Sequence, residues 1–230
     1  MVRSALDNAV LDNAVWHSLT GEHRSFAEVA GRAARYDPDV SVFAAVEEVD
    51  DGSWRDLASV VGSGGSAVLF RDTVGDPPPG WTHLGGGVGH QMVLGELGAV
   101  TIPETRALGP DDAGEMLALV ELTQPGPFRP RTVELGAYFG VFDDRELVAM
   151  AGERLHLPGF CEISAVCTRP DHRGRGLAAG LTALVARGIQ ARGEEPFLHH
   201  AADNDPARRI YEALGFEFRR EISIAVVGAP

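Results

Sequence analysis

The chain has 230 residues, of which 44% are hydrophobic and 23% charged, the balance of an ordinary folded protein with a sizeable core. Its net charge of -13 argues against a general nucleic-acid-binding protein, which needs a basic surface, and is compatible with a cationic acceptor. No run approaches the roughly 18 consecutive apolar residues of a membrane span. The composition therefore predicts a globular protein without a nucleic-acid partner or a membrane segment.

The N-terminus and the two cysteines bear on the compartment. Residues 1–3 are soon followed by Asp7 and Asp12, so the apolar core of a signal peptide is missing and we expect a cytoplasmic protein. Cys161 and Cys167 lie in one predicted strand, about 20 Å apart when extended, which is too far for a disulfide. We expect both to be reduced and buried. No metal-ligand spacing surrounds them, so we expect no metal.

The first 98 residues predict an α/β region. The run of glycines at residues 85–89 lacks the spacing of a phosphate-binding loop, and no amphipathic helix follows it, so we expect a plain loop there. A boundary near Gly98 divides this region from residues 99–230. The hydrophobic periodicity predicts helices at residues 26–34 and 54–61, and strands at residues 40–49, 67–70 and 90–94.

From residue 99 the predicted elements follow one another closely. The helix at residues 110–122 has acidic residues in its first turn, where the helix dipole favours them. Two strands form a hairpin about Asp143 and Asp144. The elements are strands at residues 100–108, 137–142, 146–157 and 160–168, and helices at residues 110–122 and 130–135.

Residues 169–178 form the most informative segment. A loop rich in glycine and arginine joins the strand at residues 160–168 to an amphipathic helix that ends at Gly193. Such a loop presents unpaired N–H groups and the positive helix end to an anion. Gly174 and Gly176 allow close approach of the backbone, and the neighbouring arginines add charge. The segment predicts a pyrophosphate site, with a plain glycine turn as the alternative.

A second segment follows the predicted strand at residues 197–201. Asp205 is expected to cap a helix that has Pro206 at its first position and ends at Gly215, before a last strand. Tyr211 lies beside the apolar face of this helix, with its hydroxyl free for a role.

Together the two segments resemble the signatures of the GNAT superfamily of acetyl-CoA-dependent N-acetyltransferases. Within the superfamily, the sequence of these segments is most similar to the glycine N-acyltransferase-like branch, and the resemblance covers residues 99–230. The acyl-CoA loop R/Q-x-x-G-x-G/A is matched by Arg173, Gly174, Arg175, Gly176, Leu177 and Ala178. The second signature is matched by Asn204, Ala207, Tyr211, Gly215 and Phe216.

The resemblance implies the α/β (α+β) GNAT fold, a mixed and mostly antiparallel sheet flanked by helices. Residues 99–230 would form the acyltransferase domain. Residues 1–98 show neither signature and would be either a degenerate copy of the same fold or a cap. A homodimer is left open.

The resemblance also implies how acetyl-CoA is held as co-substrate. The main chain of Val166, Cys167 and Thr168 would pair with the pantetheine arm, and Asn204 would form a hydrogen bond with the pantetheine. The loop from Arg173 through Gly174, Arg175, Gly176 and Leu177 to Ala178 would hold the pyrophosphate. The acyl carbonyl would lie where the strands at residues 160–168 and 197–201 part.

Direct attack of an amine on a thioester needs a base, an oxyanion donor and an acid. Tyr211 is the candidate acid, because of its place in the second signature. Glu162 is the candidate base, because its offset from Arg173 is similar to that of the catalytic glutamate in the superfamily's histone-acetylating branch. A core tyrosine and a structural or substrate-binding glutamate are the alternatives. His199 and His200 are reserve bases; as adjacent strand residues they face opposite sides, which favours packing over a metal site.

We therefore expect an enzyme, an N-acetyltransferase that moves an acetyl (acyl) group from acetyl-CoA to a small or amino-acid-like amine. A peptide or protein N-terminal acetyltransferase is the second interpretation. A non-catalytic acyl-CoA-binding regulatory or interaction module is the third, and the presence of both Glu162 and Tyr211 favours catalysis over it. The acyl length and the acceptor's identity are left open.

Overall fold

The computed structural model describes residues 8–230, whose strands join in one sheet with the order β1-β2-β3-β4-β11-β5-β10-β9-β8-β7-β6. Residues 1–7, on which part of the signal-peptide expectation rests, lie outside this description. No helix within residues 8–230 is long and apolar enough to cross a membrane.

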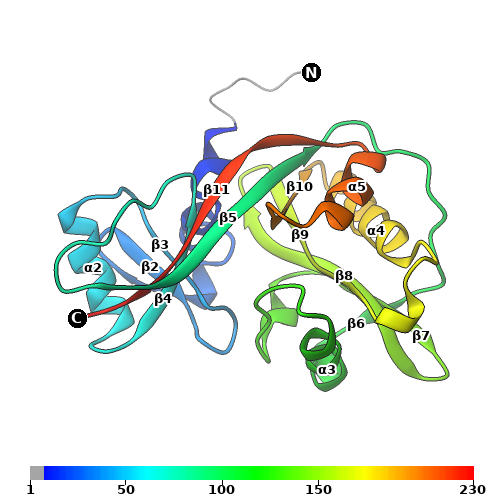
Figure 1. Cartoon of the computed structure of the whole chain (residues 1–230), viewed down its shortest axis with the longest axis horizontal. Coiled ribbons are helices and arrows are strands. Elements are labelled where there is room, and N and C mark those ends of the chain that lie inside the picture. The colour runs from blue at the N-terminus through cyan, green and yellow to red at the C-terminus, as the bar shows by residue number, and fades with distance from the viewer. Residues whose placement is uncertain (1–7) are drawn as a thin grey trace.

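The elements fall into an N-terminal and a C-terminal series (Figure 1). The first comprises η1 (Ala9–Asn13), α1 (Ala14–Thr20), η2 (Arg24–Phe26), β1 (Ala27–Ala30), β2 (Ala33–Tyr36), β3 (Phe43–Val46), α2 (Asp51–Val61), β4 (Ser66–Arg71) and β5 (Thr82–Leu94). The second comprises β6 (Arg106–Leu108), η3 (Pro110–Asp112), α3 (Ala113–Thr123), η4 (Thr132–Leu135), β7 (Tyr138–Asp143), β8 (Glu146–Leu157), β9 (Phe160–Thr168), η5 (Pro170–His172), α4 (Leu177–Ala191), β10 (Glu195–Ala201), α5 (Asp205–Ala213) and β11 (Phe216–Gly228).

The same connectivity occurs in both series. Strands β1, β2 and β3 are antiparallel neighbours, and α2 then leads to β4, which is parallel to β3. Strands β7, β8 and β9 repeat this pattern, and α4 leads to β10, which is parallel to β9. This repetition supports a degenerate copy of the same fold over a cap in the first half of the chain.

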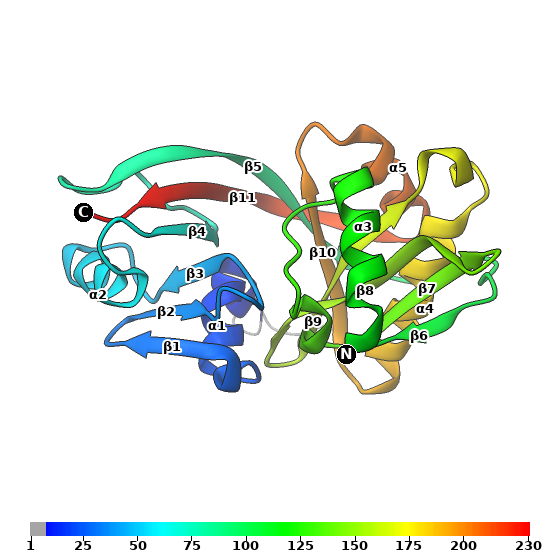
Figure 2. The same ribbon diagram turned by 90° about the horizontal axis from the view of Figure 1, so that it is seen from below.

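The last strand of each series pairs with the other series. β5 pairs with β10, β11 pairs with β4, and β5 and β11 pair with each other along almost their whole lengths. Figure 2 shows β1 to β4 on one side, β6 to β10 on the other, and β5 and β11 passing between them. The expected boundary near residue 98 falls after β5, yet β5 lies in the middle of the shared sheet, so the division into two domains stays a proposal.

Helices cover the sheet through the apolar faces that the periodicity predicts. Leu181, Val185 and Ile189, on the apolar face of α4, are fully buried and pack in one cluster with residues of β9 and β10. Each such side chain stabilises the fold by roughly 1.5–3 kcal/mol relative to an exposed one. α4 is thereby fixed with its N-terminus at the end of β9.

Three local predictions differ from the structure. Residues 26–34 are not helical: β1 and β2 form a hairpin about Gly31, where Asp56 accepts the N–H of Arg32 at 2.8 Å. The glycine run at residues 85–89 is part of β5 rather than a loop. A Cβ at Gly86 would lie 2.1 Å from the carbonyl oxygen of Ile224, so glycine lets β11 approach there. The strand expected at residues 100–108 is confined to Arg106–Leu108.

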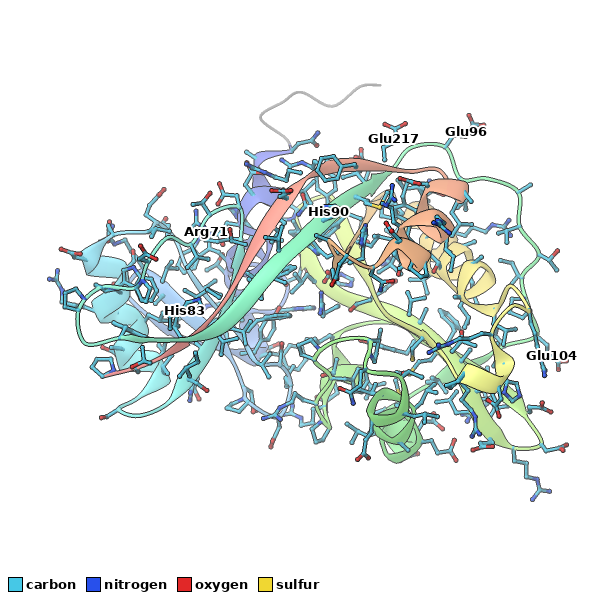
Figure 3. The ribbon with its side chains drawn as sticks, in the orientation of Figure 1. Arg71, His83, His90, Glu96, Glu104 and Glu217 are labelled. Atoms are coloured by element: carbon cyan, nitrogen blue, oxygen red, sulfur yellow. The ribbon has the colours of Figure 1, made fainter. Side chains whose placement is uncertain are left out.

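A glycine between α5 and β11 offers a test of how the two series are joined. Gly215 has a φ of +92°, and a Cβ on it would lie 2.0 Å from the carbonyl oxygen of Glu96. Figure 3 shows Glu96 in the loop after β5, beside Glu217 at the start of β11. We expect Gly215→Ala to lower the free energy of unfolding by more than the roughly 1–3 kcal/mol of a strained backbone, as measured by urea denaturation.

Gly188→Ala is the matched control. Gly188 lies within α4, and a Cβ there would meet nothing within 4 Å, so alanine should stabilise the helix by roughly 0.5–1 kcal/mol. If the Gly215→Ala variant were as stable as the wild type, the close approach of the turn at Gly215 to the loop that holds Glu96 would be contradicted.

Candidate active site

A cavity of about 910 Å³ lies beside β9, a volume typical of a small-molecule site. One part of its wall comes from β9, the loop before α4 and the first turns of α4 and α5. Another part comes from Phe43, Val68, Phe70 and Gly89 of the N-terminal series. Both halves of the chain therefore contribute to one cavity.

The cavity begins where β9 and β10 part. Their parallel pairing ends at Ile163 and Leu198, after which β9 continues beside β8 and β10 beside β5. The main chain beyond Ile163 therefore has an open edge on the cavity side. A ladder of N–H and C=O groups along such an edge is available to an extended ligand.

A bulge at Ala165 changes the direction of the main chain along this open edge. Ala165 has a φ of +53°, which is rare for a residue with a side chain, and the register with β8 shifts at this point. Backbone strain of this kind gathers at ligand sites. The bulge directly precedes Val166 to Thr168, the stretch whose main chain is expected to pair with the pantetheine arm.

The loop before α4 has the geometry of an anion site. Gly174 and Gly176 have φ values of +78° and +76°, and a Cβ on either would meet nothing within 4 Å. No side chain caps the N-terminus of α4, and its first turn holds no acidic residue. Its N–H groups and positive dipole end are thus open to a phosphate.

Most of the predicted cofactor residues line this cavity. Arg175 is the exception: its side chain is 57% exposed and lies 4.0 Å from Asp143. The residues on the wall are Val166, Cys167, Thr168, Arg173, Gly174, Gly176, Leu177, Ala178 and Asn204.

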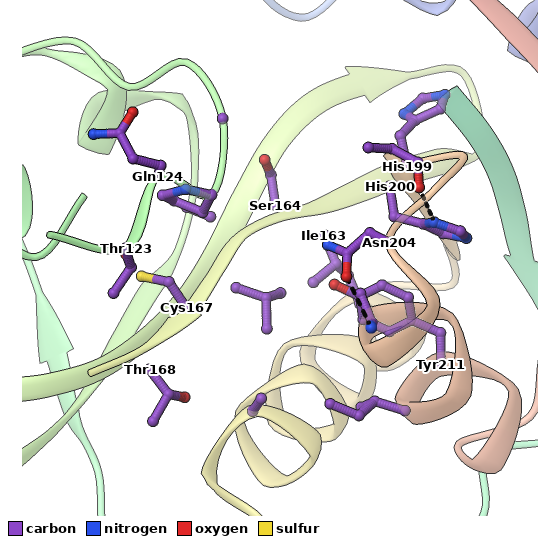
Figure 4. Close-up of a pocket in the computed structure, with 18 of the residues that line it drawn as sticks. Thr123, Gln124, Ile163, Ser164, Cys167, Thr168, His199, His200, Asn204 and Tyr211 are labelled. Atoms are coloured by element: carbon purple, nitrogen blue, oxygen red, sulfur yellow. Dashed lines mark hydrogen bonds between the residues drawn. The ribbon is translucent and has the colours of Figure 1, made fainter. Parts of the chain in front are cut away.

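Asn204 and Tyr211 face β9 across the cavity (Figure 4). Asn204, rather than the predicted Asp205, caps α5: its Oδ1 accepts the N–H of Ala207 at 3.2 Å, which leaves its amide N–H₂ as a donor. The ring of Tyr211 is buried, and its hydroxyl has no hydrogen-bond partner among the described residues. Burial raises the pKa of Tyr211 above its ordinary value, so the hydroxyl keeps its proton.

Glu162 is the predicted catalytic residue that the structure places away from the cavity wall. Its carboxylate is fully buried and accepts two hydrogen bonds from Arg154, at 2.7 and 2.6 Å, and one from His199 at 2.7 Å. Burial alone would raise the pKa of Glu162, but the Arg154 guanidinium outweighs it and lowers the pKa to about 2. So acidic and fully paired a carboxylate is a poor proton acceptor, which disfavours Glu162 as the direct base.

The two histidines differ in which nitrogen is open. The Nε2 of His199 accepts a hydrogen bond from Gln91 at 3.0 Å, and the Gln91 amide is oriented by Arg219, which donates to its Oε1 at 2.7 Å. Nδ1 of His199 therefore donates to Glu162. His200 donates from Nδ1 to the carbonyl of Ala201 at 2.8 Å, and its buried Nε2 has no partner among residues 8–230.

Burial lowers the pKa of both histidines, so both are neutral at neutral pH. The side chains lie on opposite faces, as predicted: His199 packs on Phe70 and His200 on Tyr211. Both line the cavity, and His200 is the one with an unpaired basic nitrogen.

Sequence reasoning missed Arg154 and the N-terminal wall. Arg154 lines the cavity with a nearly buried side chain, and its Nη1 has no hydrogen-bond partner among the described residues. The available signal was a pair of charged residues at 153 and 154, directly after the apolar stretch at residues 147–152. The aromatic residues Phe43 and Phe70 lie too far from the signatures to be connected with them by sequence alone.

Comparison with known proteins identifies the family. The FR47-like protein family matches residues 138–224. A solved structure from Novosphingobium aromaticivorans, assigned to the GNAT family of acetyltransferases, is 39% identical over 96% of this chain and 98% of its own, with a TM-score of 0.87. A GCN5-related N-acetyltransferase from Kribbella flavida has the same fold, at 22% identity, 96% coverage of both chains and a TM-score of 0.62. The chain therefore belongs to the GNAT family of acetyltransferases.

Curated relatives match only in part. The mycothiol acetyltransferase of Corynebacterium aurimucosum is 42% identical over 65 residues, which are 28% of this chain and 21% of that enzyme. The enzyme of Corynebacterium glutamicum is 36% identical over 77 residues, which are 33% of this chain and 26% of that enzyme. The match thus spans about a quarter or less of these relatives. Placement in the glycine N-acyltransferase-like branch stays a prediction.

The buried ion pair predicts an acid-sensitive contribution to stability. We expect Glu162→Gln to lower the free energy of unfolding at neutral pH by roughly 3–5 kcal/mol, because it leaves the Arg154 guanidinium buried without its counter-charge. The pKa of Glu162 falls from 4.5 to about 2 on folding, so its stabilisation is complete above about 4.5 and is lost as the pH falls towards 2. The difference from the wild type should therefore shrink in acid, as followed by urea denaturation at several pH values.

Glu146→Gln is the control, since Glu146 pairs with Arg169 at the surface with its side chain 63% exposed. The Glu146→Gln substitution should lower the free energy of unfolding much less than Glu162→Gln does. If both variants lost the same free energy of unfolding, the larger contribution expected of the buried Arg154–Glu162 pair would be contradicted.

Proposed function

We propose that this chain is an N-acetyltransferase that moves the acetyl group of acetyl-CoA directly to the amine of a small acceptor. The observation that carries the proposal is one cavity that joins the open edge of β9 to the uncapped N-terminus of α4. An extended arm fits the first, and a pyrophosphate fits the second.

The cofactor residues follow from this arrangement and from the family resemblance. The main chain of Val166 to Thr168 would pair with the pantetheine arm, and the free amide of Asn204 would donate to it. The N–H groups around Gly176 would hold the pyrophosphate, with Arg173 as counter-charge. Acetyl-CoA supplies an activated thioester, so no protein nucleophile is needed.

The reaction forms one C–N bond, breaks one C–S bond and moves one proton. We propose that the unpaired Nε2 of His200 accepts the proton of the attacking amine, and that the Tyr211 hydroxyl donates a proton to the departing thiolate. Their rings are neighbours, with centroids 6.0 Å apart. In this scheme Glu162 is a positioning residue that orients Arg154 and His199.

The walls of the cavity support a small acceptor with a carboxylate. Phe43 and Phe70 stack at 5.4 Å and narrow the part of the cavity that the N-terminal series lines. The open Nη1 of Arg154 is a natural partner for a carboxylate oxygen. These features favour an amino-acid-like amine over a protein N-terminus, and the partial likeness to mycothiol acetyltransferases adds a mycothiol-type amine to the acceptors worth screening.

Calorimetric titration with acetyl-CoA tests the cofactor site. We expect micromolar binding that Arg173→Ala weakens, because the variant removes a charge beside the helix N-terminus. Arg187→Ala, on the exposed side of the same helix, is the charge-matched control and should bind like the wild type. Free CoA and a longer acyl-CoA serve to define the acyl length; failure of every acyl-CoA to bind would overturn the proposal.

The pH profile of turnover tests the acid and the base. We expect the wild-type rate to fall in acid as His200 becomes protonated, below the ordinary histidine pKa of 6.5, because burial lowers that pKa. Tyr211→Phe should lower kcat by about a hundredfold or more without moving this acid limb. His200→Asn should lower kcat and abolish the limb. Full turnover by Tyr211→Phe, or an unmoved acid limb in His200→Asn, would remove the role concerned.

A further inference from the structure

A second polar cluster lies outside the cavity. The Oε2 of Glu153, the Nε2 of His156 and the Sγ of Cys161 all lie within 4.8 Å of one another. His156 Nε2 is 3.2 Å from the glutamate oxygen and 3.0 Å from the sulfur. None of the three residues lines the cavity, so the proposed acetyl transfer does not use them.

A bulge in the β8–β9 hairpin assembles this cluster. Glu153 pairs with Ile163 and His156 pairs with Cys161, so two residues of β8 lie opposite the single residue Glu162 of β9. Strand residues three apart normally face opposite sides of a sheet. The extra residue turns His156 to the face of Glu153, where its cross-strand partner Cys161 also lies.

The three atoms converge on one point rather than forming a chain of hydrogen bonds. A single nitrogen of His156 faces both the sulfur and the carboxylate oxygen, whereas an imidazole nitrogen carries one proton or one lone pair. Two ligands at zinc bond lengths of about 2.0 and 2.3 Å lie about 3.5 Å apart at a tetrahedral angle. The separations of His156 Nε2 from the sulfur, 3.0 Å, and from the glutamate oxygen, 3.2 Å, are within a few tenths of an ångström of such ligand spacings.

We propose that Glu153, His156 and Cys161 form a Zn²⁺ site. Cysteine and histidine together select zinc over the hard cations Mg²⁺ and Ca²⁺. Glu153 and Cys161 are buried and His156 is partly exposed, so a water molecule completes the tetrahedron on the histidine side. Arg192, at the end of α4, donates to Oε1 of Glu153 at 2.9 Å, and the N–H of Ala137 donates to Oε2 at 3.2 Å. A carboxylate oxygen accepts more than one bond, so Oε2 keeps a lone pair for the metal.

The site would link the hairpin bulge to the end of α4. Arg154 and Glu162, in the same bulge, lie on the other face of the sheet, where Arg154 lines the cavity. A bound ion would thus fix the segment that holds the buried ion pair. The sequence gives no sign of it, since the ligands have no zinc-motif spacing and a bulge brings them together.

Titration of the whole, reduced chain with Co²⁺ tests the site. We expect one equivalent to produce the visible ligand-field bands of a tetrahedral ion and a thiolate-to-cobalt charge-transfer band in the near ultraviolet. Cys161→Ser should abolish the thiolate band. Cys167→Ser should retain it, because this second free cysteine lies on the cavity wall. Glu153→Gln should keep the band but weaken binding more than tenfold.

Zn²⁺ calorimetry gives a second readout that does not depend on a colour or on activity. One-to-one binding, lost in Cys161→Ser and kept in Cys167→Ser, would support the proposal, with circular dichroism to show that each variant folds. Absence of Co²⁺ and Zn²⁺ binding to the wild type would overturn it. So would a thiolate band that survives Cys161→Ser or disappears in Cys167→Ser.

Discussion

The separation of β9 from β10 is the constraint on which the rest of the structure depends. Two parallel strands that stop pairing in mid-sheet leave backbone groups without partners, and these must be satisfied elsewhere. β5 does not satisfy them on the β10 side, because it pairs with the opposite edge of β10, as far as Ala201. On the β9 side they remain open to the cavity. The fold therefore keeps its unsatisfied edge at the place where an extended ligand can complete it.

The exchange of β5 and β11 explains why a single series would not suffice. The edge of β10 opposite β9 is paired by β5, from the N-terminal series, rather than by β11. In return β11 completes the sheet beside β4, and α2 covers this end of the sheet through a separate apolar cluster. The aromatic residues of β3 and β4 are thereby carried to the cavity wall. The N-terminal half thus contributes to the cavity wall without containing either signature segment.

The sequence predicted what depends on local spacing. The hairpin, β9, the amphipathic helix α4 and the glycine loop are all set by residues within a short stretch, and each was found close to its predicted bounds. The predicted roles of the loop and of Tyr211 remain proposals. What failed depends on partners far along the chain: the glycines at residues 85–89 form a strand because β11 lies against them, and residues 26–34 form a hairpin with Asp56 holding its turn.

Glu162 shows why a residue's role is harder to predict than its face. Strand alternation alone places Glu162 on the face opposite its neighbour Cys161. It does not show how many residues of the facing strand lie opposite Glu162. The bulge places Arg154 against Glu162 and turns a candidate base into half of a buried ion pair. The same extra residue brings His156 to Glu153 and Cys161 on the other face. The extra residue in β8 thus fixes both the ion pair of Glu162 with Arg154 beside the cavity and the arrangement of Glu153, His156 and Cys161 on the opposite face. A change in the bulge would therefore alter both faces of the hairpin.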